Sequence, residues 1–300
     1  MKAELHKKPL IPAGWLRALL FIIFYFAISI SAGIIISAIT AKNIAALNSE
    51  NNKSSLFYLV TFINAALGVL IVWLFRKIID RRSFESLGFG IAKNGSHAAT
   101  GFFLGIFLLC LGSCILFFTK NLVWTDINFN GSDLFIGFGL MLMSAFSEEI
   151  ICRGYILNNL LDSMGKWPAL ILSALLFALA HFANPDFSVI AAVNIFLAGL
   201  LLGLNYIYTR NLWFGIALHF SWNFFQGPIL GYEVSGIPLK SLLEHDVQGS
   251  VLLTGGKFGF EGSLLASVLL ALSIAALLWV YESKFRPVAS IENEQAPAAA

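Results

Sequence analysis

Long apolar runs constrain this chain more than any other feature of its sequence. Several are close to the roughly 20 residues needed to cross a bilayer core. There are eight, at residues 15–39, 56–75, 100–118, 134–161, 167–182, 187–206, 213–225 and 262–281. Only 12% of the 300 residues are charged, against about 25% in an ordinary soluble domain, and mean hydropathy is +0.81. Because the runs lack the alternation of a barrel strand, the sequence predicts an all-α, polytopic membrane helix bundle with about eight transmembrane helices.

The distribution of lysine and arginine predicts how this bundle is oriented. With the N-terminus in the cytoplasm, thirteen of these residues fall on the cytoplasmic side and five outside, with Arg153 left in the core. This is the bias expected from the positive-inside rule, so both termini are predicted to be cytoplasmic. Residues 1–286 are expected to form a single transmembrane domain. The tail, 287–300, is low in hydrophobic residues and is expected to be disordered.

Three charged residues lie close together inside the fourth apolar run: Glu148, Glu149 and Arg153. A charge at bilayer depth costs about 2.5 to 3.5 kcal/mol on insertion scales. A cluster of three charges there therefore indicates a structural or functional role. On a helix, Glu149 and Arg153 are i,i+4 neighbours and can pair. Glu148 is one residue away from Glu149, so its side chain points about 100° away from this pair around the helix axis. It is therefore expected to have no partner within its own turn. It must then face a wet cavity or be held protonated, and either condition suits a general base.

Two histidines and an asparagine in the later runs complete a candidate site within the bundle. His181 ends the fifth run, and His219 and Asn223 lie one helical turn apart in the seventh. The other three histidines fall between runs, whereas an ionisable side chain inside a span is a functional hypothesis by default. Such a set can activate water at a carbonyl. Glu148 would take the proton, His181 would orient the water, and His219 with Asn223 would stabilise the oxyanion.

The chain resembles the CPBP family in three motifs that follow in order: Glu148-Glu149-x-x-x-Arg153-Gly154, Phe177-x-x-x-His181 and His219-x-x-x-Asn223. This family comprises the CAAX prenyl endopeptidases and their bacterial, Abi-like bacteriocin-processing and immunity relatives. The resemblance covers about 134–225, and the motifs are specific as an ordered set although each is weak alone.

The resemblance implies an intramembrane glutamate protease with eight helices. Glu148 would be the water-activating base and His181 its partner, and His219 and Asn223 would be the oxyanion donors. The implied reaction is hydrolysis of a peptide bond in a membrane-associated peptide or protein tail, without a cofactor.

The supporting positions of the motif and the expected partners also follow from the resemblance. Glu149 and Arg153 match positions that support the site, whereas Cys152 departs from the phenylalanine common there in bacterial members. The partners would be a peptide or lipid-modified protein substrate and membrane lipids, in a bacterial plasma membrane. The net charge of +2 and the lack of a basic stripe give no indication of nucleic acid.

Each site residue also has a plainer structural interpretation. Glu149 and Arg153 are as readily a structural ion pair, and His181 can cap a helix end before the Ala183-Asn184-Pro185 segment. His219 and Asn223 can hold two helices together by hydrogen bonds.

Two other functions remain open at this point. A catalytically silent immunity or scaffold protein of the same family would bind a peptide or partner without cutting it, although it has no need of the full set of polar residues. A metalloenzyme would use Glu148, His181 and His219 as zinc ligands. The metal hypothesis is less favoured because no H-E-x-x-H helix is present and the set is dispersed over three spans.

The fifth and sixth runs raise two questions of helix geometry. His181 falls about 20 Å along its predicted helix at 1.5 Å per residue, deeper than the cytosol-facing site implied by the resemblance. Either that helix starts earlier, or it is irregular near Asn184-Pro185. Gly199-x-x-x-Gly203 predicts a face where two helices pack closely.

Overall fold

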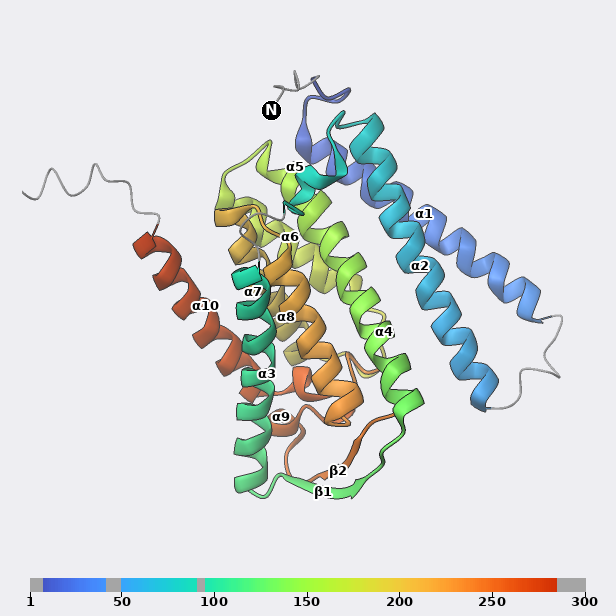
Figure 1. Ribbon diagram of the computed structural model, residues 1–300, viewed down its shortest axis with the longest axis vertical. Coiled ribbons are helices and arrows are strands. Elements are labelled where there is room, and N and C mark those ends of the chain that lie inside the picture. The colour runs from blue at the N-terminus through green and yellow to red at the C-terminus, as the bar shows by residue number, and fades with distance from the viewer. Residues whose placement is uncertain (1–7, 42–49, 91–94, 285–300) are drawn as a thin grey trace, which may run out of the picture.

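The computed structural model describes residues 8–41, 50–90 and 95–284, and the predicted disordered tail lies outside these. Within them the fold is a helical bundle (Figure 1). Each apolar run of the sequence forms or begins with a helix: α1 Gly14–Ala41, α2 Glu50–Ile78, α3 Gly95–Phe118, α4 Gly131–Glu149, α6 Lys166–Ala180, α7 Val189–Thr209, α8 Trp213–Phe224 and α10 Leu264–Lys284. The fourth run continues beyond α4 through a π-helix and a further helical turn. The predicted polytopic helix bundle is confirmed.

The lengths of these helices refine the expected number of spans. Six segments are long and apolar enough to cross a membrane: Gly14–Ile36, Leu56–Ile78, Gly95–Phe118, Gly131–Leu161, Val189–Thr209 and Leu264–Lys284. By this criterion the expected number of about eight full spans becomes six in the described part of the chain. Helices α6 and α8 are shorter, with 15 and 12 residues. Helix α6 stops before Pro185, and α8 continues only as a π-helical turn, Phe225–Ile229, that contains Pro228.

A two-stranded ribbon absent from the all-α prediction lies at the end of the bundle away from the N-terminus (Figure 1). Strands β1, Leu122–Ile127, and β2, Leu243–Val247, pair antiparallel with a bulge near Asp126. Two helical turns, α5 Asn158–Leu161 and α9 Val251–Thr254, and three 3₁₀ turns, at 84–87, 256–258 and 260–262, complete the described elements. The sequence did not predict the ribbon because its two strands are short and lie more than 100 residues apart.

Close helix packing brings the later helices together around the site. Helix α3 packs along α8, and α6 along α7. A Cβ built on Gly199 would lie 3.0 Å from the Cα of Ala174 on α6, so the close-packing interpretation of Gly199 is confirmed. In Figure 1, α1 and α2 form a hairpin on one side of the bundle, and α10 lies on the other.

Helix ends set the positions of the polar residues. Asn130 caps α4 by accepting hydrogen bonds from the backbone N–H groups of Ser132 and Asp133 at 3.0 and 3.3 Å. At its other end α4 runs from Glu149 directly into a π-helix, Ile150–Leu157. π-Helical segments are frequent at functional sites, and this one, of eight residues, lies immediately beyond the two glutamates.

A second group of charges, of which Arg17, Arg76 and Asp80 are buried, joins the α1–α2 hairpin to the rest of the bundle. We call it the anchor cluster, and its members are Arg17, Arg76, Asp80 and Asp162. Arg17 lies 3.0 Å from Asp80 and 2.8 Å from Asp162, and Arg76 lies 2.9 Å from Asp80. Asp80 also accepts hydrogen bonds from Tyr155 of the π-helix and Asn159 of α5. The hairpin is therefore tied to the segment that follows Glu149.

Candidate active site

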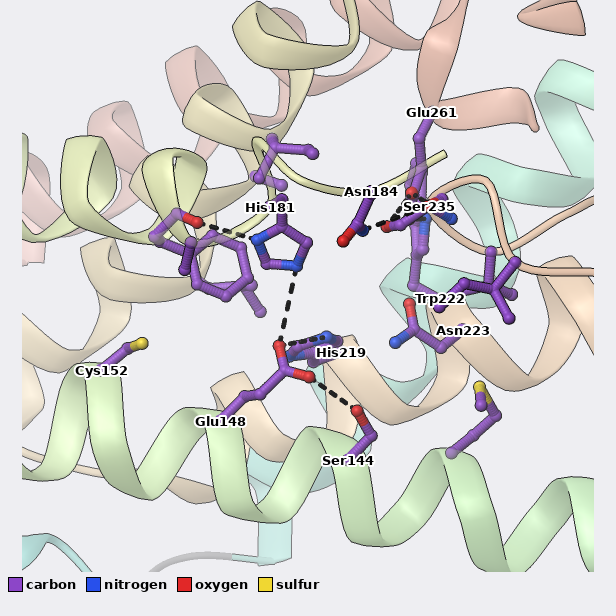
Figure 2. A pocket seen from close by; sticks show the side chains of 18 of the residues that line it. Ser144, Glu148, Cys152, His181, Asn184, His219, Trp222, Asn223, Ser235 and Glu261 are labelled. Carbon is purple, nitrogen blue, oxygen red and sulfur yellow. Dashed lines mark hydrogen bonds and ion pairs between the residues drawn. The ribbon is translucent and has the colours of Figure 1, made fainter. Parts of the chain in front are cut away.

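Glu148 lies near the end of α4, and its carboxylate faces two imidazole rings (Figure 2). Its Oε2 atom lies 3.8 Å from His219 Nε2 and 4.0 Å from His181 Nε2. Its other oxygen, Oε1, accepts a hydrogen bond of 2.6 Å from the hydroxyl of Ser144, one turn earlier. Glu148 is expected from the sequence to have no partner within its own turn, and the structure adds one from the turn before, the hydroxyl of Ser144. Oε2 has no hydrogen-bond partner in the described part of the chain.

The two histidines each present Nε2 to Glu148 because their other ring nitrogen is occupied. His181 follows the last residue of α6, and its Nδ1–H donates to the carbonyl of Phe177 at 2.8 Å. His219 lies on α8, and its Nδ1–H donates to Glu149 Oε1 at 3.1 Å. Since a carbonyl and a carboxylate only accept, both neutral rings carry their proton on Nδ1.

Glu149 and Arg153 form the ion pair that their spacing predicts. Arg153 Nη1 lies 2.7 Å from Glu149 Oε1, and both side chains are buried. The same oxygen accepts from His219, so Glu149 joins the arginine to the site histidine. Arg153 also donates to the carbonyl of Gly199 at 3.1 Å. The pair is therefore more than an isolated structural contact, because it fixes the orientation of His219.

Phe177 packs at the centre of this group. Its ring centroid lies 4.4 Å from the guanidinium carbon of Arg153, 4.7 Å from the ring of His181 and 6.0 Å from that of His219. Asn223 lies one turn beyond His219 on α8 and points into the same cavity (Figure 2). Its amide has no hydrogen-bond partner among the residues that the structure describes. It is free to bind a ligand.

A cavity of about 410 Å³ surrounds these groups, and its lining is mostly apolar. Helices α1 and α2 contribute Tyr25 and Phe57, and the segment after α8 contributes Val234 and Leu239. The Glu148 side chain is 32% exposed, so one of the two environments expected for it, a cavity, is the one observed. The cavity lies inside the helix bundle, as the sequence predicts for the site.

The structure brings together all six residues predicted from the sequence, and it adds others. Ser144, Cys152, Asn184, Ser235 and Glu261 also line the cavity. Ser144 stands four residues before Glu148, a helical spacing that could have identified it. Ser235 and Glu261 follow the three motifs in a segment of irregular structure, where no local pattern indicates that they return to the site.

The depth of His181 follows from the end of its helix. Helix α6 begins at Lys166 and ends at Ala180, and the turn that follows holds His181 and Asn184. The chain is irregular near Asn184-Pro185, but helix α6 begins at Lys166, one residue before the predicted run, so His181 still lies at its far end. His181 therefore sits at a helix terminus inside the bundle, where its ring is positioned by the Phe177 carbonyl.

The ligand set of the metal hypothesis also meets here, since Glu148, His181 and His219 converge. Among the described residues, no group of three or more histidine, cysteine, aspartate or glutamate side chains has the arrangement of a metal site. The zinc alternative remains a prediction that a chelator experiment tests.

The fold and the site define an integral membrane protein with a polar site enclosed between its helices. Residues 130–225 match the family model described as type II CAAX prenyl endopeptidase, Rce1-like. This segment, from the cap of α4 to the end of α8, is therefore similar to the CPBP/CAAX protease family, the same family that its motifs indicate. Comparison with curated proteins gave no match. The family supports an intramembrane protease of the CAAX type.

Proposed function

We propose that this protein is an intramembrane endopeptidase in which Glu148 activates a water molecule to hydrolyse a peptide bond. The observation that carries this proposal is the convergence of Glu148 Oε2 with the Nε2 atoms of His181 and His219, at 4.0 and 3.8 Å, in an apolar cavity. The family match of residues 130–225 supports the same reaction class.

The positions of the protons around Glu148 favour activation of a water molecule. With both rings neutral, three acceptor atoms face one another: two imidazole nitrogens and one carboxylate oxygen. Three acceptors are stable together only when a proton donor is shared among them. A water molecule meets this need, and Glu148 Oε2 is the basic atom positioned to take its proton.

The remaining steps use groups on α8. The water oxygen adds to the carbonyl carbon of the substrate while its proton moves to Glu148. Asn223 Nδ2–H then donates to the developing oxyanion. His219 accepts from the water while its ring is neutral, and it adds a second donor from Nε2 only after its ring has taken up a proton from solvent, with Glu149 accepting from Nδ1 in both forms. The carbon–nitrogen bond breaks, and the leaving amine takes the proton from Glu148.

The substrate that fits this cavity is a membrane-associated peptide or protein tail. A largely apolar lining stabilises hydrophobic side chains or a lipid group, and the CAAX protease family acts on prenylated protein substrates in membranes. A prenylated tail is therefore the first substrate to test. We also propose that both termini lie in the cytoplasm, on the basis of the lysine and arginine distribution, and that the membrane is a bacterial plasma membrane.

Cleavage assays on the purified protein test the proposal. The wild type would be given fluorogenic peptides, including a farnesylated tail peptide, with and without a chelator, and products identified by mass spectrometry. Cleavage should be lost in Glu148→Gln and His219→Ala and should survive the chelator. Asp133→Asn is the matched control, because it makes the same carboxylate-to-amide change on α4 at a residue paired with the exposed Lys240.

Three other outcomes would redirect the proposal. Cleavage that the chelator abolishes and zinc restores would support the metal reaction. Cleavage retained by Glu148→Gln would remove the glutamate from its role. Equal inertness of a folded wild type and its variants, together with peptide binding, would favour the silent immunity or scaffold function.

A further inference from the structure

A second carboxylate lines the same cavity, on the far side from Glu148. Figure 2 shows Glu261, Ser235 and Asn184 on one side and Glu148 with Ser144 on the other. Glu261 belongs to the short 3₁₀ turn 260–262 before α10, and it lies beyond the segment that matches the family model. The water-activating mechanism makes no use of it.

Three neutral donors hold the Glu261 carboxylate in place. Its Oε1 accepts from the indole N–H of Trp222 at 3.0 Å. Its Oε2 accepts from the backbone N–H of Ser235 at 3.1 Å and from the Ser235 hydroxyl at 2.7 Å. A carboxylate has about four lone-pair sites, so Oε1 keeps the capacity for one more donor. The charge is oriented by these contacts, but none of them neutralises it.

The charge balance of the cavity is one-sided. In the described part of the chain, its lining contains two carboxylates, Glu148 and Glu261, and no lysine or arginine. Among the described residues, Glu261 forms no ion pair. A fixed negative charge in an apolar, concave site attracts a cation from solution and discriminates against an anion.

We propose that Glu261 forms a subsite for a cationic group of the substrate, such as the side chain of a lysine or arginine near the scissile bond. This inference rests on the proposed function, because it names a feature of the peptide that the same cavity binds. A cation there donates to the open side of Glu261 Oε1, while Ser235 and Trp222 hold the carboxylate still. A substrate segment carrying negative charge would meet Glu261 and no basic side chain of the lining.

The competing explanation is structural: by accepting hydrogen bonds from Ser235, Glu261 holds the segment after α8 in place over the cavity (a pinning contact). That role needs the hydrogen bonds but not a ligand. The two explanations differ in the discrimination between charged and neutral peptides, which a pinning contact does not produce.

Equilibrium binding to the Glu148→Gln protein tests the proposal without requiring cleavage. In that background Glu261 is the remaining carboxylate of the cavity lining. Short fluorescent peptides would carry lysine, glutamine or glutamate at one position, moved stepwise along an otherwise neutral sequence. At the register that meets Glu261, lysine should bind about ten- to a hundred-fold more tightly than glutamine, as a charged hydrogen bond allows, and glutamate should bind weakest.

Two further variants separate charge from pinning. Glu148→Gln/Glu261→Gln should bind the lysine and glutamine peptides equally. Glu148→Gln/Ser235→Ala loses the hydroxyl contact but keeps the charge, so it should retain the lysine preference. The proposal is overturned if no register prefers lysine, if the preference survives Glu261→Gln, or if no peptide of the set binds. The proposed function fails by a different result, namely absence of cleavage by a wild type that binds these peptides.

Discussion

Two clusters of buried charge lie in this bundle, and they differ in how completely their carboxylates are paired. In the anchor cluster, Asp80 Oδ1 receives Arg17 and Tyr155, and Oδ2 receives Arg76 and Asn159. In the active-site cluster, Oε2 of Glu148 and Oε2 of Glu149 have no hydrogen-bond partner among the described residues. Both clusters draw on the continuous segment that runs from α4 through the π-helix to α5.

This difference in the pairing of carboxylates distinguishes the structural role of the anchor cluster from the chemical role of the active-site cluster. A buried carboxylate that is fully paired is costly to disturb and contributes to the specificity of packing. A carboxylate oxygen without a partner retains its capacity to accept a proton, and of the two unpaired glutamates only Glu148 is among the residues that line the cavity. The anchor cluster therefore fixes the α1–α2 hairpin, whereas the active-site cluster leaves Glu148 available to a water molecule.

The largest effect is expected from removing a cation of the anchor cluster. Arg17→Met removes one of the two cations on Asp80 and one of the two on Asp162, which keep Arg76 and Arg82, so it should lower the free energy of unfolding by about 3 kcal/mol, the low end of the cost of breaking a buried pair. Unfolding in detergent followed by circular dichroism measures this. The control is Lys240→Met, where the exposed pair with Asp133 should contribute only about 0–1 kcal/mol. Equal effects of the two substitutions would contradict the structural role.

The next effect concerns the free amide in the cavity. Asn223→Ala should lower kcat about 10²- to 10³-fold, because it removes a donor to the oxyanion. KM and the unfolding midpoint should change little, since this amide has no hydrogen-bond partner in the described part of the chain. Steady-state kinetics on any peptide that the wild type cleaves measures the change. A fall in the unfolding midpoint with unchanged kcat would instead identify Asn223 as a contact between helices.

Substitution of Gly215, which lies against Glu149, is expected to have an intermediate effect on stability and turnover. A Cβ on Gly215 would lie 2.7 Å from Glu149 Oε2, so Gly215→Ala must displace the carboxylate that orients His219. Overpacking of this kind costs about 1–3 kcal/mol, and kcat should fall as His219 turns. Gly139→Ala is the matched control on α4, because its Cβ would meet nothing within 4 Å. Its stability should be equal or slightly higher, given the better helix propensity of alanine.

The smallest effect lies in the ribbon at the end of the bundle. His245 of β2 packs against Trp124 and Tyr232, and burial lowers the pKa of its imidazole below the ordinary value of 6.5. Its folded pKa is thus below its unfolded pKa, so its contribution to stability is complete above pH 6.5 and is lost as the pH falls below it. Hydrogen exchange of the β1–β2 amides, corrected for intrinsic rates, should show protection decreasing from pH 7.5 to 5. His245→Phe should remove this dependence, and its persistence would contradict the assignment.

Local patterns in the sequence predicted much of this molecule. The apolar runs located the eight helices, and the i,i+4 spacing of Glu149 and Arg153 predicted their ion pair because both lie on one helix face. The three motifs contain four residues that line the cavity, Glu148, His181, His219 and Asn223, and their catalytic roles stay a prediction.

What the sequence missed depends on contacts between distant segments. His219 reaches Glu149 across 70 positions, and the ribbon pairs strands from opposite sides of the motif region. The π-helix after Glu149 has no propensity signal of its own. Glu261 joins the cavity only because the segment after α8 folds back over it, which no local pattern reveals.

The most direct test of this account is the turnover per folded molecule of Glu148→Gln beside Asp80→Asn, at a temperature where both remain folded. The account predicts that Glu148→Gln unfolds like the wild type and loses turnover by about 10² to 10⁴, the usual contribution of a general base. Asp80→Asn should unfold earlier and keep the turnover of the wild type. Retained turnover in a folded Glu148→Gln, or loss of it in a folded Asp80→Asn, would contradict the division between the two clusters.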